Sequence, residues 1–488
     1  MEETLDPANW NEMEKLGLQM VSDMMHNLAT VRDRKVWQAP PSEVRKYFQQ
    51  PPPAEGESPD KIYQAFKDNI LPYPTGNIHP RFWGWVMGNG TPFAMLADML
   101  AAGINLNQGG GNQAGGLVET QVIEWFKELF GFPADSSGLV VSGGSMANLI
   151  GITVARYAHA DFNLRKEGLY GSTKRMMVYA SKEVHNCVNK SIDVLGLGSD
   201  SLRLIDVNKD FQIDIEKLKA QIASDRKSGM QPFCIIANAM TVNTGATDDM
   251  NALADLCEKE NMWLHVDGAI GAMLALSEEY KHLVKGMERA NSIAFDLHKW
   301  MYVPYEAGCV LVRNKDQHYK AFSVQAAYLQ HVDRGMAAGD TWFSDYGIEL
   351  SRGFKALKIW MSIKEHGFRK FGRMVTQNIE QVQYLKSLVM KNSELELSAP
   401  APLNILCFRY KGNLTDHITL NALNKELLLQ MHESGVALPS YTTLNDVYSL
   451  RVANTNHRTV KEDFDMLIEK VLELGAALAA VPGGSKQP

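Results

Sequence analysis

Trp263–Ala272 reads WLHVDGAIGA, and Ser292–Cys309 reads SIAFDLHKWMYVPYEAGC. Each segment begins with an apolar run of about four to six residues, which is the length of a buried strand. Asp267 stands at the end of the first run, and Lys299 closely follows the second. Residues at the ends of neighbouring strands in an α/β sheet converge on the crevice where ligands bind. We therefore expect the Asp267 carboxylate and the Lys299 amine to face one site.

Short apolar runs alternate with helical patterns from about residue 91 to about residue 367. This alternation predicts an α/β domain with a mainly parallel central sheet and helices on both faces. The predicted strands are Gly138–Val141, Met176–Ala180, Phe233–Ala237, Trp263–Val266, Ser292–Phe295 and Cys309–Val312. The predicted helices between them include Met146–His159 and Asn251–Asn261. We assign residues 91–366 to this large domain.

The segments on either side differ from the large domain. Apolar residues at spacings of three and four predict an amphipathic first helix, and Asp6-Pro7 is a plausible start signal for it; these residues are Met13, Leu16, Met20, Met24 and Leu28. A proline-rich break follows at Gln50–Pro59. Residues 1–90 have a poor core of their own, so we expect an arm at a dimer interface. A long helix from Phe354, with strand-like Asn404–Phe408 and Tyr448–Val452, predicts a small α+β domain over residues 367–488.

Composition is that of an ordinary soluble protein. The 488 residues are 45% hydrophobic and 22% charged, and the net charge of -7 does not favour nucleic-acid or anionic-membrane partners. The N-terminus is acidic and lacks an apolar signal region, and no stretch approaches a membrane span. Five scattered cysteines form no CxxC pair, which predicts reduced thiols, a cytosolic setting and no zinc site.

Lys299 and Asp267 together suggest a specific chemistry. A lysine that forms a Schiff base, facing an acid that keeps a pyridinium nitrogen protonated, is what pyridoxal phosphate requires. Burial beside cationic groups is expected to lower the pKa of Lys299 and to free its amine. The alternatives are a structural salt bridge from Lys299 to Asp296, and a helix-capping or arginine-binding role for Asp267.

Two further features fit that chemistry. The turn Ser142–Ser145 (SGGS) follows a predicted strand and opens a helix, so its backbone N–H groups suit a phosphate. The alternative is a tight connection without a ligand. His185 follows strand MMVYA, where an imidazole could stack on a cofactor ring or have only a structural role. Neither GxGxxG nor a P-loop is present, which disfavours dinucleotides and nucleoside triphosphates.

These motifs, taken together, resemble the group II pyridoxal-phosphate-dependent decarboxylases, which act on aromatic amino acids, tryptophan, glutamate and cysteine sulfinate. The resemblance runs nearly end to end, and DLHKW downstream of HVDGA is its most specific part. The segments that carry it are His79–Leu100, Val118–Pro133, Val141–Leu149, Trp263–Ala272, Asp296–Trp300, Tyr346–Trp360 and Ser449–Thr459. It implies the type I, aspartate aminotransferase-like fold and a homodimer with sites at the interface.

The resemblance also implies roles for individual residues. Lys299 matches the Schiff-base lysine, Asp267 the pyridinium partner and His185 the stacking histidine. Tyr328 matches a loop tyrosine that serves the neighbouring subunit's site and protonates Cα, and its alternative is an ordinary loop residue. The remaining matches are cofactor contacts: Gly144 and Ser145 in the phosphate turn, Ala269 against the ring, and Asp296 and His298 beside the lysine.

Several positions bear on the substrate. Met240-Thr241-Val242 stands where several relatives have Gly-Thr-Thr, so the contact made by the second threonine is in doubt. Trp85, Val86 and Gly88 replace residues common in animal aromatic decarboxylases. The glycine-rich stretch 105–116 either leaves room for a bulky side chain or permits a tight backbone path. Arg352 and Arg451 are candidates for contact with the substrate carboxylate, or for structural ion pairs.

The sequence therefore predicts a cytosolic, homodimeric L-amino acid decarboxylase. Trp85 and its apolar neighbours favour an aromatic substrate. The alternatives are an acidic or non-proteinogenic substrate, an aldehyde synthase or aminotransferase, and a non-catalytic interaction protein. Tyr328 favours amine formation, because aldehyde-forming relatives tend to carry phenylalanine at that position.

Overall fold

The computed structural model describes residues 2–324, 332–339 and 341–480. In these ranges a seven-stranded sheet has the order β2-β8-β7-β6-β5-β3-β4. Its strands are β2 (Ser137–Val141), β3 (Met176–Ser181), β4 (Leu202–Ile205), β5 (Gln231–Asn238), β6 (Trp263–Asp267), β7 (Ser292–Asp296) and β8 (Gly308–Val312). Each of the six predicted runs is one of these strands. Only β4 was not predicted.

Most neighbouring strands of this sheet are parallel. The exception is β8, which runs antiparallel to both β2 and β7. Asn238 pairs with Asp267, and Asp267 pairs with Ala294, so the carboxyl ends of β5, β6 and β7 meet at one edge. The predicted α/β fold with a mainly parallel sheet is confirmed, and the strand ends converge as expected.

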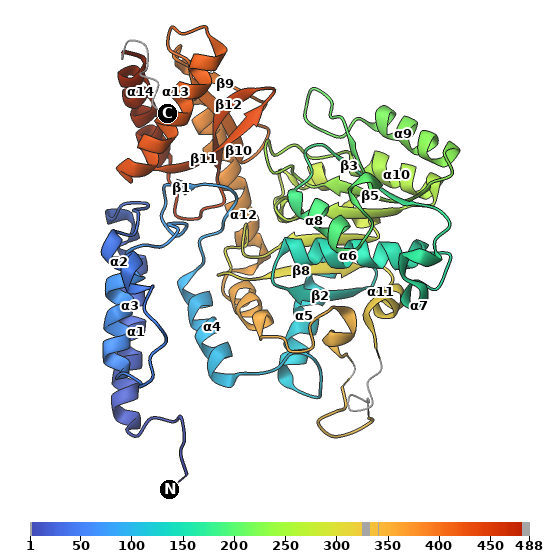
Figure 1. The fold of residues 1–488 in the computed structure, drawn as a ribbon, viewed down its shortest axis with the longest axis horizontal. Helices are drawn as coiled ribbons and strands as arrows, with labels where there is room; N and C mark the ends of the chain where they lie inside the picture. Colours follow the sequence, from blue (N-terminus) through green and yellow to red (C-terminus); the bar gives the residue numbers. More distant parts are fainter. Residues whose placement is uncertain (1, 325–331, 340, 481–488) are drawn as a thin grey trace.

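Helices cover the sheet and form the N-terminal segment (Figure 1). In chain order, the first eleven are α1 (Trp10–Ala29), α2 (Ser42–Tyr47), α3 (Pro59–Asn69), α4 (Pro92–Ile104), α5 (Ala114–Leu129), α6 (Gly144–His159), α7 (Leu164–Glu167), α8 (Asn186–Val194), α9 (Ile215–Lys227), α10 (Met250–Glu260) and α11 (Lys315–Phe322). Helix α6 packs along β5 to β8 and points its N-terminus at the edge where the strand ends meet. Helix α5 packs against β2, and its Phe126 ring contacts those of Phe295 and Phe368.

A second sheet forms the small domain. Its five strands within the described residues have the order β1-β11-β12-β10-β9. They are β1 (Phe82–Trp83), β9 (Leu395–Leu397), β10 (Ile405–Tyr410), β11 (Leu438–Leu444) and β12 (Val447–Ala453). Helices α13 (His417–Ser434) and α14 (Lys461–Ala480) pack with this sheet, and α12 (Lys355–Lys391) joins it to the large domain. Helix α12 has a kink at Gly367, whose φ of 68° is not helical.

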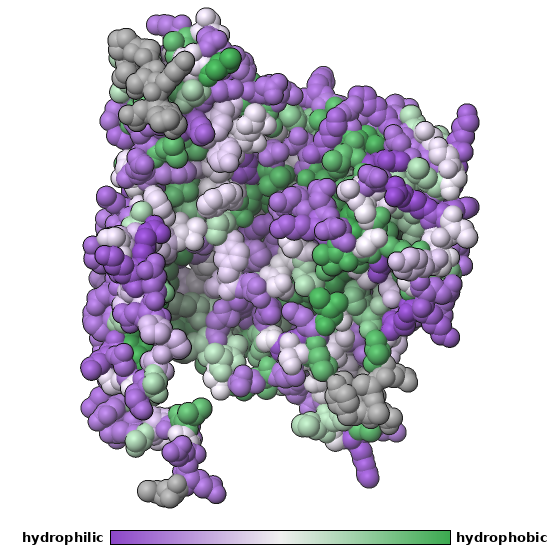
Figure 2. Space-filling view, viewed as in Figure 1, coloured by the Kyte–Doolittle hydropathy of each residue, from purple (hydrophilic) through white to green (hydrophobic). Residues whose placement is uncertain are grey.

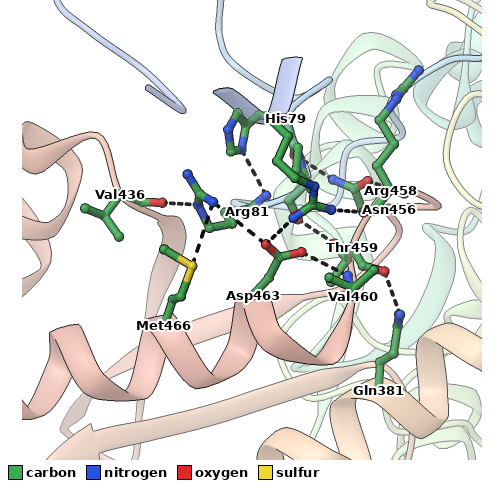
Figure 3. A network of polar contacts seen from close by, with 12 residues as sticks. His79, Arg81, Gln381, Val436, Asn456, Arg458, Thr459, Val460, Asp463 and Met466 are labelled. Carbon is green, nitrogen blue, oxygen red and sulfur yellow. Dashed lines mark hydrogen bonds and ion pairs between the residues drawn. The ribbon is translucent and has the colours of Figure 1, made fainter. Parts of the chain in front are cut away.

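Strand β1 ties the N-terminal segment to the small domain, because it pairs with β11. Figure 3 shows the polar contacts that accompany this pairing. Arg81 donates through Nε to the Val436 carbonyl at 2.7 Å, and the Asp463 carboxylate accepts from Arg32 at 2.7 Å. Asp463 is almost fully buried, and Arg81 Nη1 also lies 3.9 Å from its Oδ1, so this carboxylate holds the segments that carry Arg32 and Arg81 against α14.

The first helix begins later than the sequence suggested. Asn9, not Asp6-Pro7, is its N-cap, and its side-chain oxygen accepts the N–H groups of Asn11 and Glu12. Figure 1 shows α1 and α3 side by side along one flank of the molecule, and Tyr63 of α3 donates to Asp23 of α1 at 2.8 Å. In the ranges given above, no helix has the length and apolar character needed to cross a lipid bilayer.

Candidate active site

A cavity of about 570 Å³ opens at the carboxyl edge of the central sheet. Asn238, Asp267 and Asp296 reach it from the ends of β5, β6 and β7, and Lys299 follows Asp296. The turn before α6 forms one side, and residues of the small domain form the other. These walls include Ser142, Gly143, Gly144, Ser145, His185, Ala269, His298, Ser440, Tyr441 and Arg451. The structure thus brings most of the predicted site residues into one cavity.

Lys299 and Asp296 form an ion pair in the base of the cavity. Lys299 Nζ lies 2.8 Å from Asp296 Oδ2, and Asp296 Oδ1 accepts the N–H of Gly144 at 2.5 Å. Burial alone would lower the pKa of Lys299, but the charge and hydrogen bond of Asp296, helped by Asp267, raise it. The expectation of a lowered pKa is therefore wrong for this arrangement, since the carboxylate outweighs desolvation. Lys299 therefore both forms the salt bridge to Asp296 and lines the cavity, so these two roles do not exclude each other.

Asp267 and His185 also face this cavity. Asp267 is buried, and its Oδ1 accepts the N–H of Ala269 at 3.1 Å. His185 caps α8, because its Nδ1 accepts the N–H of Cys187 at 3.2 Å. Burial lowers the pKa of His185 despite the nearby Asp267 carboxylate, so its ring is neutral at physiological pH. A neutral ring that accepts at Nδ1 carries its proton on Nε2.

The turn between β2 and α6 needs its glycines. A Cβ on Gly144 would lie 2.9 Å from Asp296 Oδ2, and a Cβ on Gly143 would lie 3.0 Å from His298 Cε1. The backbone can therefore lie directly beside the Lys299–Asp296 pair. Helix α6 begins at Gly144, whose N–H is bonded to Asp296, so the positive dipole end and the N–H groups of the residues that follow Gly144 in the first turn face the cavity. This geometry suits a phosphate group.

His298 supports the segment that carries Lys299. Its Nδ1 accepts the N–H of Ala307 at 3.1 Å, and its ring lies against that of Tyr305 with centroids 4.3 Å apart. Burial lowers the pKa of His298 even though Asp296 opposes the shift. Gly88 packs on the other side, where a Cβ would fall 2.0 Å from the His298 carbonyl oxygen. Gly88 therefore contacts the backbone beside Lys299, and it is not among the residues that line the cavity.

Arg451 reaches the cavity wall from β12 and holds several segments together. It donates through Nη1 to the Trp85 carbonyl at 2.7 Å and through Nε to the Asn243 carbonyl at 3.3 Å, and Nη2 donates to the Val242 carbonyl. Burial lowers its pKa to about 10, so the guanidinium is still protonated at neutral pH. Trp85 itself lies at the mouth of the cavity and is 59% exposed.

Arg352 does not line this cavity, so the candidate contact with a substrate carboxylate is corrected here. Its guanidinium forms a bidentate pair with Glu119, at 2.6 and 3.1 Å, and also donates to the carbonyls of Gln108 and Val140. Both side chains of the pair are almost fully buried. Arg352 therefore has the structural ion-pair role that the sequence left open.

The Met240-Thr241-Val242 segment has an unusual backbone. Met240 has a φ of 72°, in the region that favours glycine. Thr241 faces inward, pairing with the Thr244 hydroxyl at 3.0 Å, and Val242 lines the cavity. Val242 thus adds an apolar side chain to the cavity wall.

The glycine-rich stretch 105–116 permits a tight backbone path. A Cβ on Gly110 would fall 2.4 Å from the Trp342 ring, and one on Gly109 would fall 2.3 Å from the Leu350 carbonyl oxygen. The stretch therefore packs against Met336, Trp342 and Leu350. Tyr328 lies outside the described residues.

The sequence did not single out several residues that line the cavity. These are Asn238, Cys187, Ile270, Tyr305, Glu306 and Tyr441. Asn238 had a detectable signal, since it directly follows the predicted strand Phe233–Ala237, as Asp267 directly follows the predicted strand Trp263–Val266. Tyr441 had none, because β11 alternates exposed and buried residues and is largely polar.

Fold and site together define a pyridoxal-phosphate-dependent enzyme of the type I fold. Residues 41–411 match the family model described as "Pyridoxal-dependent decarboxylase conserved domain", and the chain belongs to this family. An aromatic-L-amino-acid decarboxylase of Bacillus atrophaeus is 34% identical over 467 residues, covering 95% of each chain. A phenylacetaldehyde synthase of Petunia hybrida is 26% identical, over 92% of this chain and 90% of its own.

Solved structures have the same fold. The crystal structure of Oryza sativa TDC with pyridoxal phosphate (PLP) and tryptamine superposes with a TM-score of 0.89 at 21% identity, over 97% of this chain and all of the other. The cofactor of the family fits the residues present here. The cavity offers an amine at Lys299, a carboxylate at Asp267 and a glycine-lined helix N-terminus at Gly144.

Proposed function

We propose that this chain decarboxylates an aromatic L-amino acid to the corresponding amine, and that Lys299 binds the cofactor covalently. When bound, pyridoxal phosphate accepts the electron pair that remains at Cα as carbon dioxide leaves. The observation that carries the proposal is the meeting of Lys299, Asp267 and His185 in one cavity beside the N-terminus of α6.

Each of these residues has a definite task in the proposal. The Asp267 carboxylate raises the pKa of the ring nitrogen that it faces and so keeps it protonated. His185, with its neutral ring, and Ala269 line the cavity and would hold the cofactor ring there. The turn at Gly144 and Ser145 would hold the phosphate, with Gly144 leaving room for it and the Ser145 N–H donating to it, since the Gly144 N–H is bonded to Asp296. Asp296 and His298 hold the lysine segment in place.

The walls of the cavity favour an aromatic side chain. Trp85, Tyr305 and Tyr441 line it together with apolar Val86, Met240 and Val242. Among the described lining residues, the permanently charged cations are Lys299 and Arg451. An acidic substrate needs one cation for each carboxylate, and Lys299 is committed to the cofactor. Arg451 has one guanidinium N–H beyond its four hydrogen bonds, which could bind the α-carboxylate.

The deciding experiment measures carbon dioxide release from the standard L-amino acids, DOPA and 5-hydroxytryptophan. We expect release from aromatic substrates only, and none from Lys299→Ala. Release from glutamate or cysteine sulfinate would contradict the substrate class. Ammonia and peroxide assays on the same reactions separate amine formation from the aldehyde synthase activity named for the Petunia relative.

We further propose that the enzyme is a homodimer in which Tyr328 of one subunit protonates Cα in the other subunit's site. Exposed apolar side chains on α1 and α4 support an interface there; they include Trp10, Leu18, Phe93, Met99, Leu100 and Ile104. Figure 2 shows apolar surface in the recess between the N-terminal helices and the rest of the molecule.

Mixing two impaired variants tests the shared site. Lys299→Ala should form no amine and Tyr328→Phe little, but a mixed dimer has one site with both native residues. Refolding the two together should raise amine formation above that of either variant alone. Absence of this rise, with mixed dimers shown by mass, would place Tyr328 in its own subunit's site.

A further inference from the structure

Lys299 is followed by a tight turn whose two largest side chains reach the same residue of α12. Trp300 donates through Nε1 to Asn378 Oδ1 at 3.1 Å, and the Tyr302 hydroxyl donates to the same oxygen at 2.7 Å. All three side chains are almost fully buried. Because an indole nitrogen can only donate, these contacts fix Asn378 Oδ1 as the acceptor.

The amide nitrogen of Asn378 is equally committed. It donates to Gln381 Oε1 and to the Asn456 carbonyl, each at 3.1 Å. Gln381 in turn donates to the Thr459 carbonyl at 2.7 Å, a contact seen in Figure 3. One uncharged, fully bonded amide therefore connects the turn after Lys299 with the loop between β12 and α14 of the small domain.

The backbone of the turn after Lys299 is unfavourable by itself and is stabilised by tertiary contacts. Tyr302 has a φ of 52°, which is unfavourable for a bulky residue, and its N–H bonds the Lys299 carbonyl at 3.2 Å. Gly88 packs against the same backbone from another side. Loss of the Asn378 oxygen would leave two buried donors without a partner, and the turn would be free to shift.

We propose that Asn378 is a positioning residue for the decarboxylase reaction: through Trp300 and Tyr302 it sets where the Lys299 amine stands in the cavity. It does not touch the cofactor or the substrate. Its effect is on the geometry of the lysine, and a displacement of about 1 Å near a reacting group can cost as much as about a hundredfold in rate. Because Asn378 also donates to the Asn456 carbonyl, the position of the Lys299 amine depends on the position of the small domain.

The test compares Asn378→Leu with Asn424→Leu. Asn424 is a matched control, because it is a fully buried asparagine of α13 that hydrogen-bonds Tyr410 and Leu420 away from Lys299. Two readouts report on the lysine rather than on stability. One is the rate at which apoprotein captures pyridoxal phosphate, and the other is the pH midpoint of the cofactor absorbance change in the holoenzyme.

We expect Asn378→Leu to slow cofactor capture, to shift that midpoint, and to lower kcat by about tenfold or more while KM changes much less. Asn424→Leu should lower the unfolding temperature without moving either lysine readout. A folded Asn378→Leu protein with native capture rate and midpoint would overturn the proposal, as would an equal shift in Asn424→Leu.

Milder variants cover the case in which Asn378→Leu does not fold. Tyr302→Phe removes one donor and keeps the ring, and Trp300→Phe removes the other donor and keeps a smaller aromatic ring. Each should shift the absorbance midpoint in the same direction, and the two shifts should not add, because both act through one oxygen. Native midpoints in both variants would contradict the proposal.

Discussion

Lys299 and Asp296 form a salt bridge of 2.8 Å, and Asp296 binds the Gly144 N–H with its other oxygen. One carboxylate thus links the amine that the proposed chemistry needs to the turn that suits a phosphate. Its charge raises the pKa of Lys299 against the effect of burial. Without cofactor the amine is therefore protonated at neutral pH.

Asp296→Asn tests this electrostatic effect. Only the neutral amine attacks an aldehyde, and a raised pKa means that this form appears only at higher pH. Removing the charge should lower the pKa of Lys299, so the pH profile of cofactor capture by apoprotein should move to lower pH. The amide oxygen can still accept the Gly144 N–H. Asp206→Asn, at a surface aspartate paired with Lys182 and Lys217, should leave the profile unchanged.

Arg352→Ala should destabilise the protein rather than weaken substrate binding. Removing one partner of a buried pair leaves the Glu119 charge uncompensated, at a cost of about 3–5 kcal/mol in the free energy of unfolding. Urea unfolding of the holoenzyme measures this change, and KM of the folded enzyme should stay native. A large rise in KM without a loss of stability would restore Arg352 as a substrate contact.

Gly88→Ala should disturb the lysine segment. The added Cβ would stand 2.0 Å from the His298 carbonyl oxygen and 2.6 Å from that of Lys299, and neither backbone group can rotate away. We expect weaker cofactor binding and at least tenfold lower kcat, a loss of about 1.4 kcal/mol or more. Gly56→Ala is the control, since nothing lies within 4 Å of its Cβ. Native cofactor affinity in Gly88→Ala would contradict the close packing.

The large sheet was predictable because its central strands are buried on both faces and appear as continuous apolar runs. β4 was missed since LRLI is short and Arg203 interrupts it. β11 was missed because its exposed residues are polar, and β1 has only two residues. β1 also depends on β11, a partner distant in sequence.

The candidate site, like the fold, could be predicted from the sequence only in part. Asp267 and Lys299 could be placed because Asp267 ends one strand and Lys299 closely follows another, and these strands are neighbours in both sequence and space. Arg352 could not be assigned, because a sequence does not reveal that Glu119, 233 positions away, neutralises it. The direction of the pKa shift of Lys299 was misjudged. Whether the Asp296 carboxylate outweighs burial depends on its distance from the Lys299 amine, which the sequence does not give.

Buried histidines should make the protein sensitive to acid. Burial lowers the pKa of His265 and of His318 to about 3, and that of His79 to about 4. In the unfolded chain each titrates near 6.5, so between that pH and the folded pKa only the unfolded state binds the proton. Stability is therefore full above about pH 6.5 and falls as the pH drops, by up to about 1.4 kcal/mol per pH unit for each histidine.

His265 offers the sharpest test of this acid effect. Its Nε2 bonds Asn148 Oδ1 at 2.8 Å and its Nδ1 bonds Ser292 Oγ at 2.7 Å, so the neutral ring is fully paired. Urea unfolding at pH 7 and pH 5 should show a smaller acid loss in His265→Gln than in the native protein, even if His265→Gln is less stable at both. The exposed His282→Gln should reproduce the native loss. An equal loss in His265→Gln and native protein would mean that His265 takes up its proton in the folded state.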